Sequence, residues 1–214
     1  MPSVIGIEGY FKTGKTSLAN KLSKEFDIPV FEIGVLYRII ASKLSAKHLS
    51  EKEIESYVTS KSLSSIMDDL DIVYNMEGSF YSIPNDIYTP GIDLLSSKIG
   101  ALTLGKWYDD LGTLIKNMSE STKLIVVGRN LLRIYPQLDA HIFLSASLDK
   151  IVELAQKDNP KWNYETARNY VIERDKKESL IRDLSLKRDD LTILVNISGK
   201  SADDVFNYVA EKIS

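Results

Sequence analysis

The sequence contains no cysteine and only two histidines among its 214 residues. The absence of cysteine excludes disulfides, thiolate metal ligands and a cysteine nucleophile, and it fits a reducing compartment. His48 and His141 are distant from each other in the sequence, and two isolated histidines are too few for a typical zinc site. We therefore expect neither a disulfide-stabilised protein nor a zinc protein.

Long apolar runs are also missing. No run approaches the roughly 18 residues typical of a membrane span, and the opening segment MPSVIGIEG lacks the charged region that begins a signal peptide. The formal net charge of −3 at pH 7 does not indicate a broad surface for nucleic acid. The sequence thus predicts a cytoplasmic protein whose partners include neither a membrane nor a nucleic acid.

Short β-rich runs alternate along the chain with longer helical patterns. Strands are expected at 3–8, 30–33, 123–127, 140–144 and 191–196. Helices are expected at 15–26, 34–44, 51–67, about 91–101, about 103–118, 147–157, 164–181 and 202–213. This alternation predicts an α/β fold with a parallel sheet, and continuous apolar strands such as KLIVV predict that both faces of the sheet are buried.

Residues 45–100 read as an insertion in this α/β core. Within them, two short strand patterns at 71–74 and 80–83 flank the dipeptide Glu77-Gly78 and predict a β-hairpin. An insertion with its own hairpin is expected to form a small subdomain beside the sheet.

The stretch GYFKTGKTS carries the clearest chemical signal. Gly9, Gly14, Lys15 and Thr16 match the phosphate-binding pattern G-x-x-x-x-G-K-[ST], between an expected strand and an expected helix. The glycines let backbone N–H groups point inward at phosphate oxygens, and the helix N-terminus adds a favourable dipole. Lys15 would reach the β- and γ-phosphates, and the Thr16 hydroxyl would bind Mg²⁺. The residues expected to hold the nucleotide are Gly9, Tyr10, Phe11, Lys12, Thr13, Gly14, Lys15, Thr16 and Ser17.

Tyr10, Phe11 and Lys12 stand where small residues would be the easy choice. Their side chains can point outward while their amides point at the phosphates, and Lys12 either adds charge near the phosphates or is a solvated lysine. The chain has no guanine-reading Asn-Lys-x-Asp motif, and the Asp-x-x-Gly match at 109–112 lies within a helical pattern. These features favour a small-molecule kinase that uses ATP over a GTPase.

Five segments, in order and with similar spacing, resemble those of bacterial cytidylate kinases, a nucleoside monophosphate kinase family. The segments are IEGYFKTGKTSLANKLSKEF, EIGVLYRIIA, MDDLDIVY with YSIPNDIYTPGIDLLSSKIGAL, VVGRN with YPQLDAHIFLSAS, and IERDKKES. Any one of them would be weak evidence, but the ordered set covers nearly the whole chain and is specific.

The resemblance implies a single P-loop NTPase domain over residues 1–214, with three α/β/α layers and a five-stranded parallel sheet. It also implies that about 45–100 form an inserted NMP-binding subdomain and that a mobile lid has its tip at about 155–166. The reaction it implies is transfer of the γ-phosphoryl group of Mg-ATP to a pyrimidine nucleoside monophosphate such as CMP or dCMP.

The resemblance assigns roles by position. Arg38 and Arg129 would hold the acceptor phosphate, because a planar guanidinium binds phosphate bidentately. Lys15 and Arg174 would stabilise the transferring charge, and Glu8 would join Thr16 beside Mg²⁺. The other positions expected to contact the acceptor are Ile33, Tyr37, Ser97, Lys106, Asn130, Arg174 and Glu178.

The chain departs from the family where the base is read. Ile33 replaces a small hydroxyl residue, and Asn130 replaces an aspartate whose carboxylate would accept from the cytosine amino group. An amide can donate as well as accept, so uracil, thymine or an unusual base stays open as the acceptor base.

The lid also departs from the family. Ile151, Leu154 and Ala155 stand where the family has arginines, and Val127 stands where it has an acid near Mg²⁺. Two alternatives to a nucleoside monophosphate kinase therefore stay open. One is a P-loop kinase for a modified or non-nucleotide acceptor, and the other is a nucleotide-binding protein with little turnover.

Overall fold

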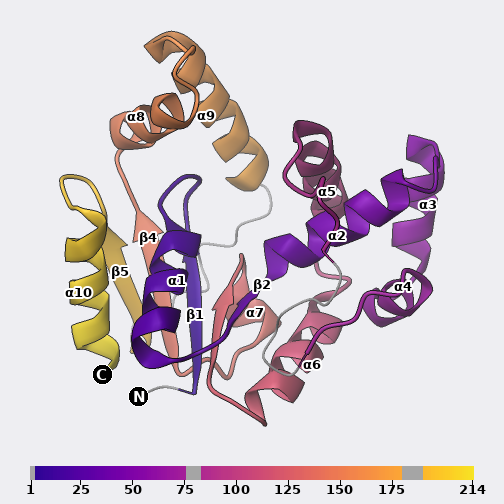
Figure 1. Cartoon of the computed structure of the whole chain (residues 1–214), viewed down its shortest axis with the longest axis horizontal. Helices are drawn as coiled ribbons and strands as arrows, with labels where there is room; N and C mark the ends of the chain where they lie inside the picture. The colour runs from indigo at the N-terminus through magenta and orange to yellow at the C-terminus, as the bar shows by residue number, and fades with distance from the viewer. Residues whose placement is uncertain (1–2, 76–82, 180–189) are drawn as a thin grey trace.

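The computed structural model describes residues 3–75, 83–179 and 190–214, without the side chains of 174–179. Its strands form one parallel sheet in the order β2-β3-β1-β4-β5 (Figure 1). The strands are β1 Val4–Gly9, β2 Val30–Glu32, β3 Leu124–Val127, β4 Ala140–Ser145 and β5 Thr192–Asn196. The predicted five-stranded parallel sheet is thereby confirmed.

Helices follow the strands in the α/β order that the sequence predicts. They are α1 Lys15–Phe26, α2 Ile33–Ser45, α3 Glu51–Ser60, α4 Leu63–Asp69, α5 Pro90–Leu102, α6 Tyr108–Ser119, α7 Leu131–Ile134, α8 Leu148–Asp158, α9 Tyr164–Ser179 and α10 Ala202–Ile213. The four-residue helix α7 was not predicted, because a single helical turn leaves too few residues for a periodic pattern.

Two hydrophobic clusters cover the two faces of the sheet. Ile5 and Ile7 of β1 pack with α1 and α10 on one face, whereas Val4 packs on the other face with α2, α6 and α7. Gly6 shares that second face, and a Cβ there would lie 2.7 Å from Leu138 Cδ1. Because successive strand residues point to opposite faces, the apolar run of β1 serves both layers, and the three-layer α/β/α arrangement follows.

The predicted helix 51–67 is in fact two helices. Ser62 accepts a hydrogen bond from the backbone N–H of Ser65 at 3.2 Å, and so caps the start of α4. Lys61, just before it, has an extended backbone that ends α3. A serine side chain can satisfy a free N–H group at a helix start, so a new helix can begin at Leu63. The apolar residues keep their helical spacing across this break, and the sequence pattern therefore does not reveal it. Of the predicted hairpin, 76–82 lie outside the described residues.

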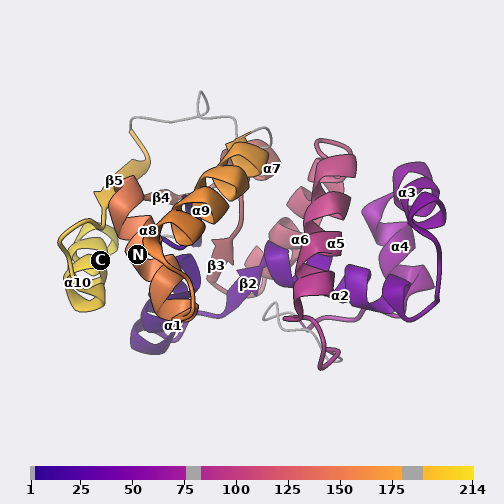
Figure 2. The ribbon, with the colours of Figure 1, turned by 90° about the horizontal axis from the view of Figure 1, so that it is seen from above.

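The helices α2 to α5 lie to one side of the sheet, and α8 and α9 lie above its carboxyl edge (Figures 1 and 2). The loop between β1 and α1 points toward α8 and α9. Carboxyl ends of parallel strands are the usual place for ligands in open α/β sheets. The fold therefore brings the phosphate loop, the α2–α5 side and the α8–α9 pair around one edge.

Gly112 shows how tightly α7 packs against the rest of the domain. A Cβ at Gly112, in the middle of α6, would lie 2.6 Å from the backbone oxygen of Ile134. We expect Gly112→Ala to lower the free energy of unfolding by about 1–3 kcal/mol, because a backbone oxygen cannot move aside cheaply. Thermal unfolding followed by circular dichroism would measure this loss.

Gly91→Ala in α5 is the matched control, since a Cβ there would meet nothing within 4 Å. In an open helical site the same substitution is expected to be neutral or stabilising, because alanine has the higher helix propensity. Equal midpoints for the two variants would contradict the close packing of α6 on α7.

Candidate active site

The phosphate loop has the conformation that its motif requires. Gly9 has φ 154°, and a Cβ there would lie 2.4 Å from the backbone oxygen of Leu144. Gly14 adopts φ 80° and caps the start of α1. Both conformations favour glycine, so the two glycines are explained by backbone geometry and close packing. The loop therefore leads directly into a helix N-terminus, as an anion site needs.

The Lys15 side chain lies across this loop. Its Nζ donates to the backbone oxygens of Gly9 at 3.1 Å and Tyr10 at 2.8 Å. The Thr13 hydroxyl also donates to the Tyr10 oxygen, at 2.8 Å. The ammonium group is thus fixed within the curve of the loop. This is where the motif predicts that Lys15 contacts phosphate oxygens.

Thr16 contacts a carboxylate that the sequence analysis missed. Its hydroxyl donates to Glu32 Oε2 at 2.9 Å, from the first turn of α1 to the last residue of β2. Both side chains are accessible at the carboxyl edge of the sheet. The position of Glu32 at the end of a strand beside the phosphate loop was the available signal.

Glu8, the carboxylate predicted to lie beside Mg²⁺, is buried on the α7 side of the sheet. It accepts a hydrogen bond from the backbone N–H of Leu131, and its Oε1 lies 3.4 Å from His141 Nε2. The other ring nitrogen of His141 lies 3.0 Å from the Thr192 hydroxyl. Glu8 therefore connects β1 to α7 in this structure.

No group of three or more histidine, cysteine or acidic side chains that could hold a metal occurs within the described residues. Mg²⁺ differs from zinc in this respect, because it commonly binds one or two protein oxygens together with substrate phosphates and water. Thr16 with Glu32 nearby fits such a site.

On the acceptor side, Arg38 is held by a carboxylate. Its Nη2 lies 2.7 Å from Asp93 Oδ1, and its guanidinium lies 5.6 Å from the centre of the Tyr88 ring. Ser97 donates to the backbone oxygen of Asp93 at 2.9 Å. The structure thus brings the predicted residues Arg38 and Ser97 together around Asp93, at the contact between α2 and α5.

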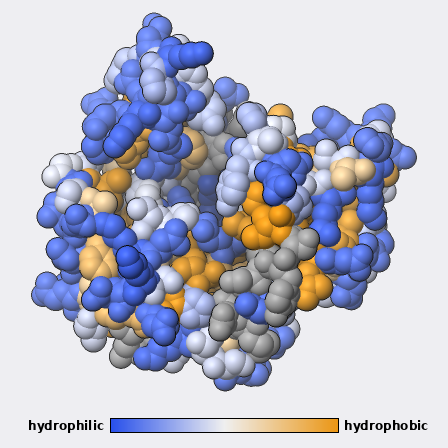
Figure 3. Space-filling model, in the orientation of Figure 1, coloured by the Kyte–Doolittle hydropathy of each residue, from blue (hydrophilic) through white to orange (hydrophobic). Residues whose placement is uncertain are grey.

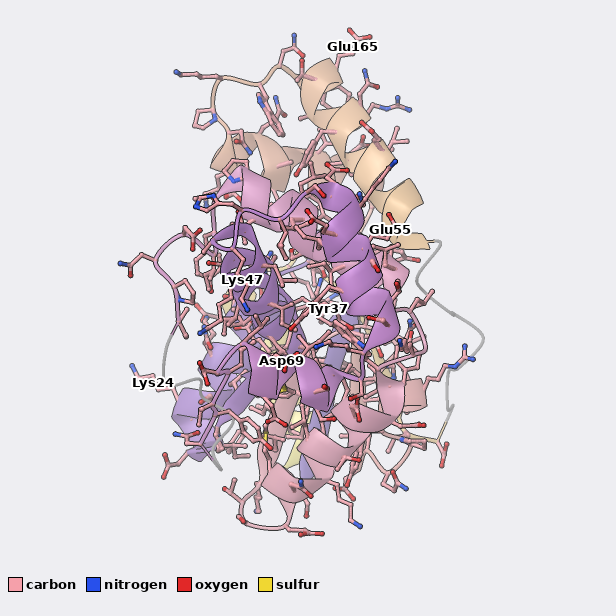
Figure 4. The ribbon with its side chains drawn as sticks, turned by 90° about the vertical axis from the view of Figure 1, so that its right-hand side faces the viewer. Lys24, Tyr37, Lys47, Glu55, Asp69 and Glu165 are labelled. Carbon is pink, nitrogen blue, oxygen red and sulfur yellow. The ribbon has the colours of Figure 1, made fainter. Side chains whose placement is uncertain are left out.

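Tyr37 lies beside Arg38 in sequence but has an interior role. Its ring stacks on Trp107 at 5.5 Å, and burial raises the pKa of Tyr37 to about 12. Figure 4 shows it near the middle of the molecule. Lys106 donates to the backbone oxygen of Thr59 in α3. In this structure, Tyr37 and Lys106 therefore contact the α5–α6 segment and α3, respectively.

Of the two positions predicted to read the base, Ile33 lies against the β3–α7 loop and Asn130 belongs to it. Ile33 is 6% exposed and its Cδ1 lies so near Gly128 that a Cβ there would be 3.0 Å away. Asn130, two residues after Gly128, has φ 54° and donates through Nδ2 to the Tyr108 hydroxyl at 2.8 Å. Arg129 lies between them in the β3–α7 loop. Tyr108 was not predicted, because no local motif links it to Asn130.

Two of the apolar residues at the predicted lid positions are buried in the structure. Ile151 and Ala155 of α8 are buried against Ala167 and Val171 of α9. Arg174 and Glu178 belong to α9, but their side chains lie outside the described residues, so their roles stay predictions.

The surface is hollowed between the α8–α9 part and the α5 part (Figure 3). In the same orientation the phosphate loop lies below α8 (Figure 1). Among the described residues there is no helix of the length and apolarity that crossing a membrane requires.

Comparison with known proteins identifies the family. The cytidylate kinase family model matches residues 5–214. The cytidylate kinase of Thermosipho africanus is 26% identical, over 100% of this chain and 95% of that protein. The cytidylate kinase of Thermotoga maritima is 24% identical, over 98% of this chain and 96% of that protein. Among solved structures, thymidylate kinase from Candida albicans covers 99% of this chain and 90% of its own, at 16% identity and a TM-score of 0.48. Because the family model spans almost the whole sequence, the chain belongs to the cytidylate kinase family.

Proposed function

We propose that this chain transfers the γ-phosphoryl group of Mg-ATP to a pyrimidine nucleoside monophosphate, with CMP or dCMP as the first candidates. The observation that carries the proposal is the phosphate loop, which has Lys15 fixed across its curve in a chain of the cytidylate kinase family. Arg38 and Ser97 on the α2–α5 side support an acceptor site for a second phosphate compound.

The residues divide into a donor set and an acceptor set. The loop amides and Lys15 bind the ATP phosphates, and Arg38 and Arg129 bind the acceptor phosphate. Arg174 stabilises the charge of the transferring group, while Ser97 and Glu178 contact the sugar. An acceptor phosphate is already a nucleophilic oxyanion, so positioning and electrostatic stabilisation supply the catalysis without a general base.

In this proposal the Thr16 hydroxyl would hold Mg²⁺, and Glu32, which accepts the hydrogen bond from Thr16, would orient it. The metal would supply positive charge to the phosphates of ATP. The Thr16–Glu32 hydrogen bond favours Glu32 over the buried Glu8 as the carboxylate beside the metal.

Asp93 has a preparatory role. Its carboxylate accepts a hydrogen bond from the Arg38 guanidinium, and an acceptor phosphate would compete for the same donor. Both groups are partly exposed, so water weakens their attraction. The pair holds the Arg38 side chain at the contact between α2 and α5.

Tyr108 bears on the choice of base. An amide presents a donor edge and an acceptor edge, and Asn130 uses Nδ2 on the Tyr108 hydroxyl. In this proposal the amide oxygen of Asn130 faces the base, and an acceptor atom there favours a base with an amino group. Cytosine is then the preferred pyrimidine, despite the change from aspartate.

The apolar lid favours one second candidate, a nucleotide-binding protein with little turnover. Ile151 and Ala155 are buried, so at these two positions α8 supplies no cation for the transferring phosphoryl group. Losing such a cation can lower the rate by several powers of ten.

The decisive experiment is ADP formation from Mg-ATP with a panel of ribo- and deoxyribonucleoside monophosphates. We expect CMP or dCMP to stimulate ADP formation at least about tenfold over ATP alone, and Lys15→Ala to abolish the stimulation, because the loop lysine carries phosphate charge. ATP binding without stimulation by any acceptor would contradict the kinase proposal and support the second candidate.

The proposed metal contact is tested by Glu32→Gln. We expect this substitution to raise the Mg²⁺ concentration for half-maximal rate by about 10–100-fold, as for other residues that orient a metal ligand. Glu32 is accessible and its change keeps the side-chain size, so stability should be unchanged. A Mg²⁺ dependence equal to that of the unaltered protein would remove Glu32 from the metal site.

Base selection is tested by two substitutions at one contact. Asn130→Asp should raise the ratio of kcat/KM for CMP over UMP by about tenfold, because a carboxylate accepts from the cytosine amino group and repels the uracil oxygen. Tyr108→Phe should lower the same ratio, because the Asn130 amide is then free to turn its donor edge to the base. Equal ratios in all three proteins would mean that Asn130 does not read the base.

A further inference from the structure

The side chains at the tip of the phosphate loop contact the α8–α9 pair. The Phe11 ring lies 5.9 Å from the Tyr170 ring in an edge arrangement, and Tyr170 lies 4.8 Å from Trp162. Tyr10 and Phe11 also pack on the apolar cluster between α8 and α9. We call Phe11, Tyr170 and Trp162 the aromatic clasp. It explains why large rings stand where the loop motif needs none.

Lys12 makes a second connection from the same loop to the same helices. It forms an ion pair with Asp158, the last residue of α8, and adopts φ 57°, which is unfavourable for a residue with a Cβ. The two side chains are 33% and 51% exposed, so water and salt weaken the pair. The aromatic clasp adds ring contacts and packs on an apolar cluster, and these contacts do not depend on salt.

The clasp selects one face of α9. Tyr170 and position 174 are four residues apart in a continuous helix, so they lie on the same face one turn apart. Ala167 and Val171, which pack on α8, lie on the same stripe of the helix, because positions 167, 170, 171 and 174 follow the spacing i, i+3, i+4 and i+7. The stripe contacts α8 through Ala167 and Val171 and contacts Phe11 through Tyr170, so the two contacts together fix the rotation of α9 about its axis. Position 174 continues this stripe.

We propose that Phe11 and Tyr170 are positioning residues for phosphoryl transfer, because their contact orients the face of α9 that carries Arg174. This inference rests on the proposed function, since it acts through the arginine assigned to the transferring charge. In this chain Ile151 and Ala155 of α8 are buried against α9, so α8 supplies no cation at these two positions, and the proposal gives that role to Arg174 of α9. In this proposal the loop that binds ATP also contacts and orients α9, the helix that contributes Arg174 to the site.

A double-mutant cycle tests the proposal with Phe11→Leu, Arg174→Ala and the double variant. Phe11→Leu keeps an apolar side chain but removes the ring, and we expect kcat to fall about 10–100-fold, as for a misplaced catalytic group. The KM for ATP should change much less, because the loop amides and Lys15 are retained. In the Arg174→Ala background, Phe11→Leu should lower kcat by less than about twofold, since residues that act as a unit are not additive. The same loss in both backgrounds would overturn the proposal.

Two further variants separate positioning from general stability. Phe11→Tyr keeps the ring and should restore kcat to near the original value. Tyr164→Leu removes an exposed aromatic ring at the start of α9, together with its hydrogen bond to Asp149 of α8, and should leave kcat unchanged because the contact with Phe11 is kept. Its neighbour Glu165 lies at one end of the molecule in Figure 4. A loss of kcat in Tyr164→Leu equal to that in Phe11→Leu would indicate only a general effect on α9.

Docking of α9 can be measured without turnover. Trp107 is 0% exposed, whereas Trp162 is partly exposed, so acrylamide quenches mainly Trp162. Phe11→Leu should increase this quenching, because the clasp around Tyr170 and Trp162 is loosened. Unchanged quenching would overturn the docking itself. If the unaltered protein phosphorylates no nucleoside monophosphate but quenching rises as expected, the proposed function and the role of Arg174 fail while the docking stands.

Discussion

The close approach of β1 to β4 at Gly9 is the constraint on which the rest of the site depends. The backbone N–H of Tyr10 donates to the Leu144 oxygen at 3.1 Å, and a Cβ at Gly9 would lie 2.4 Å from that same oxygen. The chain must therefore leave the sheet at Gly9 and curve over the end of β4. This curve gives Lys15 the two backbone oxygens that fix its ammonium group. A side chain at Gly9 would displace the loop, the lysine and the start of α1 together.

The groups expected to bind phosphate or Mg²⁺ form hydrogen bonds within this chain. Lys15 donates to loop carbonyls, Thr16 to Glu32, and Arg38 to Asp93. These hydrogen bonds keep the three side chains ordered, and ordered side chains lose less conformational entropy when they bind a ligand.

Much of the fold could be predicted because its signals are local. The helix 15–26 was predicted with the bounds of α1, and the strand KLIVV falls on β3 within one residue. The break between α3 and α4 could not be predicted from the helical spacing of apolar residues, because it depends on the Ser62 side chain capping the start of α4. The phosphate loop was recognised for the same reason as α1, since its glycines and lysine form one short motif.

The contacts of the site side chains were harder to predict because they join distant segments. Lys12 was predicted either to be solvated or to add charge near the phosphates. In the structure it pairs with Asp158, which lies 146 residues later in the sequence. Glu8 was predicted to lie beside Mg²⁺ because it precedes the phosphate loop, whereas in the structure its carboxylate contacts Leu131 of α7 and His141 of β4. A sequence motif predicts which residues lie at the end of a strand, but the partner of each side chain depends on tertiary packing.

Tyr37 shows how this packing limits the chemistry that is available. Its pKa is raised by burial to about 12, so the phenol stays neutral across the physiological range and cannot act as a base beside Arg38. The pH dependence of stability expected from this raised pKa agrees with a structural role for Tyr37. A phenol whose folded pKa is raised from 10.0 contributes stability that is fully present below pH 10 and is lost as pH rises toward 12. Stacked on Trp107, Tyr37 fixes the turn of α2 from which Arg38 extends. The neutral ring therefore packs in the interior and holds α2, whereas the charged guanidinium of the next residue pairs with Asp93 at the contact between α2 and α5.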